Sequence, residues 1–342
     1  MRIGCPMNPN LFHYATSELS QGAVLCWLLS WADTQYAQNP LHTIGKALLN
    51  LIYTQAGLEI PVSTSVVVEK QKGHIDILCV VNKELVFVIE DKAGTEQHAG
   101  QLDKLKVHVT TELGYAPGNM ILVYIQTVDQ SDYEDVAKSG YLRINRADLL
   151  AIVESAEAQG AKAHSDILSD FSAHLRRIED DVQSYHTTPP SKWSWNGWKG
   201  FYSKLQTEMG DGRWDYVANP SGGFLGYWWH FRGDEAFKVY LQLEEHYLCF
   251  KIWVNDVLKR KELRNRWHET IMAAGNARGL SLRRPRRFGL GEYMTVALLA
   301  TDYRITGDNS LLDMDKTLAL FQSAQAVIDD IHEAKIEFQP EV

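Results

Sequence analysis

Two apolar runs separated by a short polar break, at residues 73–92, constrain this chain more than any other stretch of its sequence. The break is Asn82-Lys83-Glu84, and Ile, Leu and Val dominate on both sides of it. This pattern predicts a β-hairpin with a loop of about three residues. With Lys83 at the centre of the turn, residues at equal distances from it face each other across the two strands.

The predicted register gathers three charged side chains at the open end of the hairpin. Asp76 lies opposite Glu90, and cross-strand neighbours project from the same face about 5 Å apart. The alternation of side chains along a strand places Lys92 on that face too. A shift of the register by one residue would divide the three groups between the two faces.

Charged groups on strands this apolar are costly to bury unless another group neutralises them. Two carboxylates a few ångströms apart raise each other's pKa, and a divalent cation removes that penalty. Hard oxygen ligands favour Mg²⁺ or Mn²⁺. A lysine beside the metal positions or deprotonates a water, or neutralises developing negative charge. The alternative is an ordinary hairpin whose charged residues reach solvent at a frayed end.

The chain has 342 residues, which is long enough for two domains with separate cores. His186-Thr-Thr-Pro-Pro-Ser is the best linker candidate, so we predict domains at 1–185 and 190–342. The predicted elements of the first domain are helices at 17–37 and 41–57, strands at 63–71, within 73–92 and at 119–126, a helix from about Thr95 to Leu113, a strand at 141–145 and helical sequence from Arg146 to Tyr185. This order predicts an α/β fold with a mixed sheet flanked by helices.

The second domain is predicted to be an α+β unit that opens with a tryptophan cluster at 193–198. Its predicted elements are strands at 214–219, 224–232, 236–244, 246–254, 281–288 and 292–300, and helices at 256–279 and 312–335. The tryptophans of the cluster and those at 228–229 either stack on nucleic-acid bases or pack in the core, as aromatic strand residues more often do.

Charge is distributed unevenly along the chain. Residues 1–185 hold 14 basic and 23 acidic residues, and residues 186–342 hold 20 of each. Within 251–287 there are 11 basic and 3 acidic residues. An acidic protein therefore carries one local basic surface, a feature of nucleic-acid-binding proteins.

The start of the chain shows no signal-peptide pattern, and its most apolar stretch near the start, 23–31, is too short to span a bilayer. The four cysteines are scattered and form no CxxC pair, which argues against a zinc knuckle or a disulfide framework. The sequence predicts a cytoplasmic protein with no membrane partner.

The first half of the chain resembles the PD-(D/E)XK nuclease superfamily, whose restriction-endonuclease-like core has the order αβββαβ. Asp76 matches its first acid, and Glu90-Asp91-Lys92 matches its (D/E)xK triplet. An opening helix containing Glu18 and a later Gln101-Leu102 pair match an uncharacterised bacterial subgroup of stand-alone nucleases. Members of this kind often resemble phage-defence proteins.

The resemblance implies metal-dependent phosphodiester hydrolysis. Glu18, Asp76 and Glu90 would hold Mg²⁺ or Mn²⁺, aided by a main-chain carbonyl near Asp91, and Lys92 would position or activate water. Gln101 would orient a phosphate or belong to the surface of its helix. Glu18 is equally suited to a structural role, because an acid is favourable at a helix N-terminus.

Two residues depart from the superfamily pattern. Ile75 stands before Asp76, where proline is common, and Leu105 stands four residues after Gln101, where the RecB-type branch has tyrosine. The second departure argues against an exonuclease of that branch.

Two basic clusters are candidates for binding the nucleic-acid backbone. Arg283, Arg284, Arg286 and Arg287 form the first, and the segment 259–266 on a predicted helix forms the second. Both would add salt-sensitive affinity without reading sequence. The alternative for both is a solvated surface.

The predicted function is a nuclease with DNA as the favoured substrate. A nuclease fold that binds or senses nucleic acid without turnover, and an RNA nuclease, are the alternatives. A homodimer is compatible with either.

Overall fold

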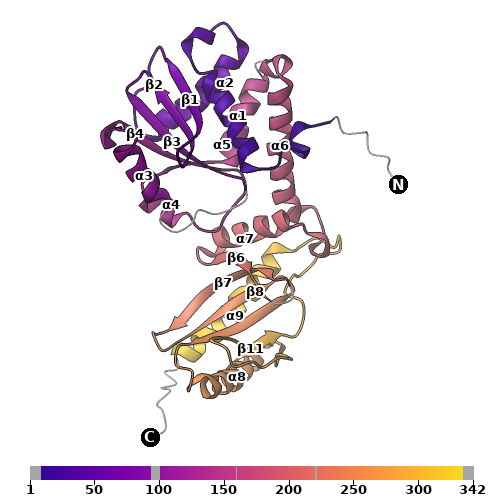
Figure 1. Ribbon diagram of the computed structural model, residues 1–342. Coiled ribbons are helices and arrows are strands. Elements are labelled where there is room, and N and C mark those ends of the chain that lie inside the picture. The colour runs from indigo at the N-terminus through magenta and orange to yellow at the C-terminus, as the bar shows by residue number, and fades with distance from the viewer. Residues whose placement is uncertain (1–8, 94–100, 159, 220–221, 334–342) are drawn as a thin grey trace. The chain divides into compact units, whose positions relative to one another are not determined.

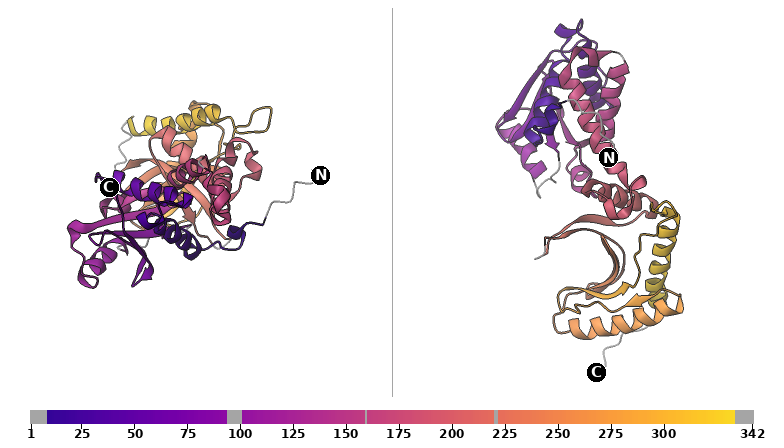
Figure 2. Two further views of the ribbon diagram at one scale, coloured as in Figure 1. Left: turned by 90° about the horizontal axis from the view of Figure 1, so that it is seen from above. Right: turned by 90° about the vertical axis from the view of Figure 1, so that its right-hand side faces the viewer.

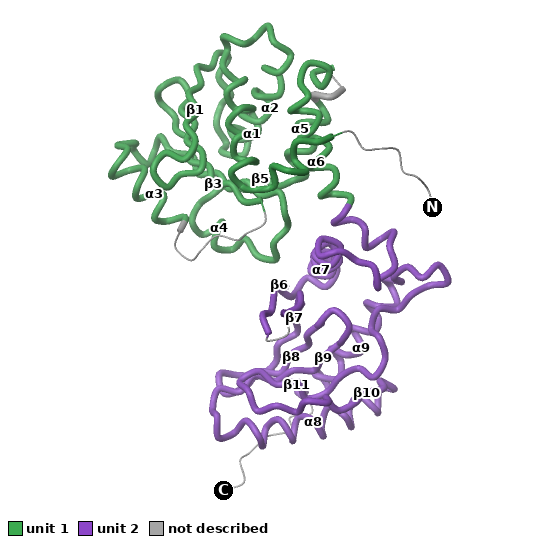
Figure 3. Tube along the Cα trace, turned by 45° about the vertical axis from the view of Figure 1, so that its right-hand side comes forward, with its two compact units in different colours: residues 1–180 green, residues 181–342 purple. Residues whose placement is uncertain are grey.

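The computed structural model describes residues 9–93, 101–158, 160–219 and 222–333, without the side chains of 101 and 156–158. The chain divides into two compact units, Met1–Asp180 and Asp181–Val342 (Figure 3). This division falls inside one helix, Asp166–Gln183, and the two ends of the predicted linker overlap short 3₁₀ helices, Ser184–His186 and Pro190–Lys192. Within the described ranges, no helix is both long enough and apolar enough to cross a membrane.

The first unit is built on a mixed five-stranded sheet in the order β1-β2-β3-β4-β5 (Figure 1). The strands are β1 (Val66–Lys72), β2 (Ile75–Val81), β3 (Leu85–Lys92), β4 (Met120–Gln126) and β5 (Leu142–Asn145). The pairs β1–β2 and β2–β3 are antiparallel, and β3–β4 and β4–β5 are parallel. The helices are α1 (Glu18–Ser30), α2 (Pro40–Gln55), α3 (Gln101–Thr111), α4 (Glu134–Lys138), α5 (Arg146–Ala158) and α6 (Asp166–Gln183). The α/β class and the αβββαβ order are confirmed.

Both faces of this sheet are covered by helices, as strands buried on both sides require. One core joins alternate strand residues such as Phe87 and Ile89 to α1, α2, α5 and α6. The other joins Val86 and Val88 to α3 and α4. Charged side chains can therefore escape the apolar layers only at the ends of the strands.

The predicted hairpin forms with the predicted register. Its pairs run from Val81↔Leu85 to Ile77↔Ile89, all centred on Lys83. Asn82 and Lys83 adopt left-handed backbone angles, with φ of 54° and 60°, as a tight reversal of this kind needs. The last regular pair is Ile77↔Ile89, so the ladder stops one position short of Asp76 and Glu90.

Local capping explains where the first helices begin. The side chain of Ser17 accepts a hydrogen bond from the Ser20 amide, so α1 starts at Glu18. Asn39 caps α2 in the same way, and Pro40 occupies its first turn. Helix α1 ends at Ser30, earlier than predicted, and a 3₁₀ turn follows at Thr34–Tyr36. The predicted start of α3 at Thr95 lies outside the described residues.

The second unit contains a six-stranded antiparallel sheet in the order β10-β11-β9-β8-β7-β6. Its strands are β6 (Arg213–Val217), β7 (Phe224–Gly233), β8 (Phe237–Glu244), β9 (Tyr247–Val254), β10 (Leu282–Arg283) and β11 (Tyr293–Leu299). Its helices are α7 (Trp195–Met209), α8 (Arg260–Ala277) and α9 (Met314–Glu333). The expected strand 281–288 shrinks to two residues, since Pro285 has no amide to donate to a ladder.

Most of these tryptophans pack in the core, so for them core packing is the role that the structure supports and base stacking is not. Trp193, Trp198 and Trp229 are buried in one cluster with residues of α7, α8 and α9. Trp195, in contrast, is 44% exposed.

Candidate active site

Three elements bring carboxylates to the carboxyl end of β3. Asp76, near the start of β2, accepts a hydrogen bond at Oδ2 from the Asp91 amide, over 3.0 Å. Glu18, the first residue of α1, accepts one at Oε1 from the Ala93 amide, over 3.3 Å. Both therefore contact the main chain that carries Glu90 and Lys92. The structure brings together four of the residues expected from the sequence.

The tightest contact in this group is the ion pair between Lys92 Nζ and Glu90 Oε1, at 2.7 Å. The two side chains are only 9% and 1% exposed. Burial lowers the pKa of Lys92, but the hydrogen bond to Glu90 and the nearby carboxylates outweigh it and raise that pKa above its ordinary value. These contacts stabilise the protonated form of Lys92.

The carboxylates of β3 titrate far above their usual range. Burial, with the charges of Asp76 and Glu18, raises the pKa of Glu90 to about 7 against the hydrogen bond from Lys92. Burial and the same neighbours raise the pKa of Asp91 to about 8. Such carboxylates are stabilised by a cation, and shifts of this kind are concentrated at functional sites.

Asp91 projects from the opposite side of β3, toward α1. Its Oδ1 accepts a hydrogen bond from Gln21 Nε2, and its Oδ2 has no hydrogen-bond partner among the described residues. Helix α1 approaches closely here because residue 22 is glycine: a Cβ on Gly22 would lie 3.3 Å from Asp91 Oδ2. The Asp91 side chain is directed toward α1, away from Glu90, so a metal contact by its main-chain carbonyl stays a prediction.

Gln21 is a site residue that the sequence did not single out. Besides Asp91, its amide nitrogen reaches the Lys92 carbonyl at 3.4 Å, and its oxygen accepts from Thr127 Oγ1 at 2.6 Å. Arg146 in turn donates to the Thr127 carbonyl over 2.6 Å. The buried chain of contacts connects α1, β3 and the end of β4. The only sequence signal was its place one turn after Glu18.

Gln126 is a second such residue, and it neighbours Lys92 in the parallel β3–β4 ladder. Side chains paired in this way share a face. Gln126 is 4% exposed, donates to Gln130 over 2.7 Å, and has a buried Oε1 without a hydrogen-bond partner in the described chain. It ends the apolar run 119–126, a polar residue at the edge where Lys92 also lies.

The donor set fits a hard divalent cation, since it consists of carboxylate oxygens, and the pKa of one of them, Glu90, is raised by burial and by its acidic neighbours. Within the described residues, no three His, Cys, Asp or Glu side chains already stand together as a metal cluster. Glu90 is paired with Lys92, and Asp76 accepts from the Asp91 amide. Gln101 begins α3, but its side chain lies outside the described residues, so its role stays a prediction.

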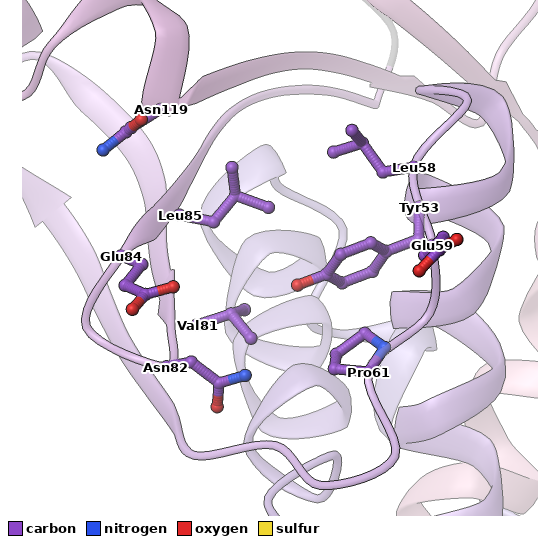
Figure 4. A pocket seen from close by; sticks show the side chains of 9 residues that line it. All are labelled: Tyr53, Leu58, Glu59, Pro61, Val81, Asn82, Glu84, Leu85 and Asn119. Atoms are coloured by element: carbon purple, nitrogen blue, oxygen red, sulfur yellow. The ribbon is translucent and has the colours of Figure 1, made fainter.

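A cavity of about 610 Å³ lies at the other end of the hairpin (Figure 4). Asn82 and Glu84 of the turn line it with Tyr53, Glu59 and Asn119. It contains none of the carboxylates described above. The cavity is therefore separate from the group of carboxylates at the open end of the hairpin.

The basic clusters of the second unit separate into structural and surface residues. Arg264 is 7% exposed and donates to the carbonyls of Phe288 and Gly289 over 2.7 and 2.8 Å. The prediction that Arg264 binds the nucleic-acid backbone is therefore wrong, because its buried guanidinium group holds the loop at Phe288 and Gly289. Arg284 lies 4.2 Å from the centre of the Phe288 ring.

The remaining arginines of the cluster line a cavity of about 680 Å³. Arg283, Arg286 and Arg287 contribute to its walls together with Glu244 and Tyr247. Arg283 lies 5.7 Å from the centre of the Tyr247 ring. In the part of the chain that the structure describes, none of these three guanidinium groups forms an ion pair.

Comparison with known proteins gives one match. A family model described as the PD-(D/E)XK nuclease superfamily matches residues 9–185. No curated protein and no solved structure matches the chain.

Proposed function

The chain belongs to the PD-(D/E)XK nuclease superfamily, and from this membership we propose that it is a Mg²⁺- or Mn²⁺-dependent nuclease that hydrolyses DNA. The observation that carries the proposal is the meeting of Asp76, Glu90 and Lys92 at the end of one apolar hairpin, with Glu18 beside them. A structural role explains this arrangement poorly, because a well-packed neutral pair often stabilises a buried position as well as an ion pair does.

Asp76, Glu90 and Glu18 are the residues that would hold the metal, with the carbonyl of Asp91. When bound, the ion would stabilise the negative charge that develops on the phosphate and activate water. The contacts of Lys92 stabilise its protonated form, which would orient the water or compensate charge next to Glu90. Gln126, beside Lys92, has a buried acceptor available for the same water.

The second unit would hold the substrate backbone through Arg283, Arg284, Arg286 and Arg287. Contacts of this type supply affinity that falls with salt and carry no sequence information. The arginines around the cavity support this role better than the helix 260–277 does. Arg264 of that helix already donates to the Phe288 carbonyl inside the fold.

The test is cleavage of supercoiled and linear DNA by the purified protein with Mg²⁺, Mn²⁺ or EDTA. We expect cleavage with either metal, loss in EDTA, and loss in Glu90→Gln and Lys92→Ala. Glu84→Gln is the matched control, because Glu84 is an exposed acid at the turn of the same hairpin. Cleavage that survives both site substitutions would refute the assignment.

A binding or sensing protein without turnover is the second candidate. It is favoured by one observation, the engagement of Glu90 and Asp76 within the protein in place of a ready cluster of ligands. It predicts DNA binding with no cleavage under any divalent ion. An RNA nuclease is distinguished in the same assay by offering RNA, because the site chemistry is common to both substrates.

A further inference from the structure

Among the described residues of the second unit, helices pack against one face of the sheet only. Phe201 of α7, Trp267 of α8 and Phe321 of α9 all pack in the same core as Tyr227 and Leu241 of the sheet. Figure 2 shows this sheet as a strong curve with α9 on its convex side. We call the opposite, concave side the open face.

The strand registers place the side chains of the open face in rows. One row crosses the sheet as Arg283, Leu298, Cys249, Gln242 and Trp228. The next contains Thr295, Lys251 and Tyr240, and the third contains Tyr293, Trp253 and Lys238. None of these residues belongs to the hydrophobic core that the helices form.

Aromatic rings on this face are exposed in a way that core packing does not explain. Tyr293 is 63% exposed, Tyr247 46% and Phe231 43%. The Phe231 ring stacks on that of Tyr240, with centroids 4.6 Å apart. Lys238 lies 5.9 Å from the centre of the Trp253 ring. Rings beside cations offer both stacking and charge to one ligand.

The face carries an excess of basic side chains. Glu244 is paired with Lys251 Nζ at 3.1 Å, whereas Glu292 keeps its charge while it accepts from Trp253 Nε1 at 2.7 Å. Arg283, Arg286 and Arg287 are left around the cavity of about 680 Å³, with Tyr247 in its wall. A cavity of that size accommodates a small-molecule-sized group such as a nucleotide.

We infer that the open face binds single-stranded DNA, with bases stacked on Tyr247 and Tyr293 and phosphates held by Arg283, Arg286 and Arg287. In a duplex the base faces are stacked on each other and only the edges are accessible in the grooves. Exposed rings interleaved with cations match unpaired bases on a continuous phosphate chain. The inference rests on the proposed function, in which the substrate is DNA, and adds that the bound DNA is single-stranded.

The test is fluorescence anisotropy with a labelled oligothymidylate and a duplex of the same length, in EDTA and with the Glu90→Gln protein. No cleavage occurs under these conditions, so binding is measured apart from the nuclease activity. We expect the single strand to bind about tenfold more tightly than the duplex. Tyr247→Ala and Tyr293→Ala should each weaken it on the order of tenfold.

Tyr247→Phe keeps the ring and should restore the affinity, which a loss of folding would not do. Tyr36→Ala is the matched control, a surface tyrosine of the first unit that is 41% exposed. Arg286→Ala with Arg287→Ala should reduce the salt slope by about 1.4. The inference is overturned by equal or tighter duplex binding, by unchanged binding in the tyrosine variants, or by tighter binding of oligouridylate. Cleavage that persists in any of these cases leaves the proposed nuclease function standing.

Discussion

The two sheets of the molecule keep their polar side chains in different places. In the first unit, helices cover both faces, and the charged groups are gathered at the end of β3, where Glu90 and Lys92 are almost fully buried. In the second unit, helices cover one face, and cations and rings are spread over the other. A buried strand end strengthens each charge interaction through the low dielectric. An open sheet face instead offers a large accessible surface on which a ligand can bind. The contrast suggests chemistry in the first unit and substrate binding in the second.

The largest expected effect is on cleavage and tests the first half of the contrast. Glu90→Gln or Lys92→Ala should lower kcat by about 10³-fold, since preorganised charge supplies transition-state stabilisation of this order. DNA affinity measured in EDTA should stay unchanged. A parallel loss of DNA affinity in these variants would show that cleavage and DNA binding are not separated between the two units.

The next effect is on stability and concerns the buried carboxyls alone. Glu90 and Asp91 have folded-state pKa values of about 7 and about 8, above the ordinary 4.5 and 3.8. Between these limits the folded chain holds more protons than the unfolded chain, so stability falls as pH rises. We expect the metal-free protein to lose unfolding free energy on the order of 6 kcal/mol from about pH 5 to about pH 8, because both groups contribute over this range.

Urea unfolding across this pH range measures the loss, and Mn²⁺ should offset it at the alkaline end. Asp91→Asn combined with Glu90→Gln removes both titrating groups and should flatten the profile. A stability that rises with pH in the unsubstituted, metal-free protein would contradict the burial of these two groups.

A smaller effect is expected from the contacts that support the site. Gln21→Leu removes the donor to Asp91 and leaves a buried carboxylate oxygen unsatisfied, at a cost of about 1–3 kcal/mol. We expect kcat to fall while KM changes little, because the ends of α1 and β3 lose their alignment. Gln35→Leu, at an exposed position, is the control and should change neither quantity.

The surface arginines should have a weaker effect, and on a different quantity. Arg286→Ala together with Arg287→Ala should weaken DNA binding about tenfold at moderate salt and less at high salt. At saturating DNA, kcat should equal that of the unsubstituted protein. A fall in kcat at saturation would place these residues in the chemistry and remove the contrast between the units.

The smallest effect is expected at the turn of the hairpin. Glu84→Gln, or Asn119→Ala in the lining of the same cavity, should change cleavage by less than about twofold, because such surface changes rarely exceed ±0.5 kcal/mol. Steady-state cleavage rates measure this. A large loss would move the functional site to the cavity in Figure 4.

Much of the first unit was predictable because its local signals agree. The polar break and the alternation of side chains set the hairpin register, and hence the meeting of Asp76 with the end of β3. A capping serine before Glu18 marked the start of α1. The second unit was predictable only in outline. The length of β10 depended on a single proline that interrupts pairing.

The sequence by itself determined which groups are available for chemistry and which faces of the strands they occupy. Those properties follow from the period of the strand and the turn, which are local. The tertiary structure alone decided that Gln21 holds Asp91, that Gln126 stands beside Lys92, and that Arg264 is used inside the fold while Arg286 is not. The physical reason is that a hydrogen-bond partner or the burial of a charge depends on segments far apart in the chain, such as α1 and β3, and no local pattern specifies their approach.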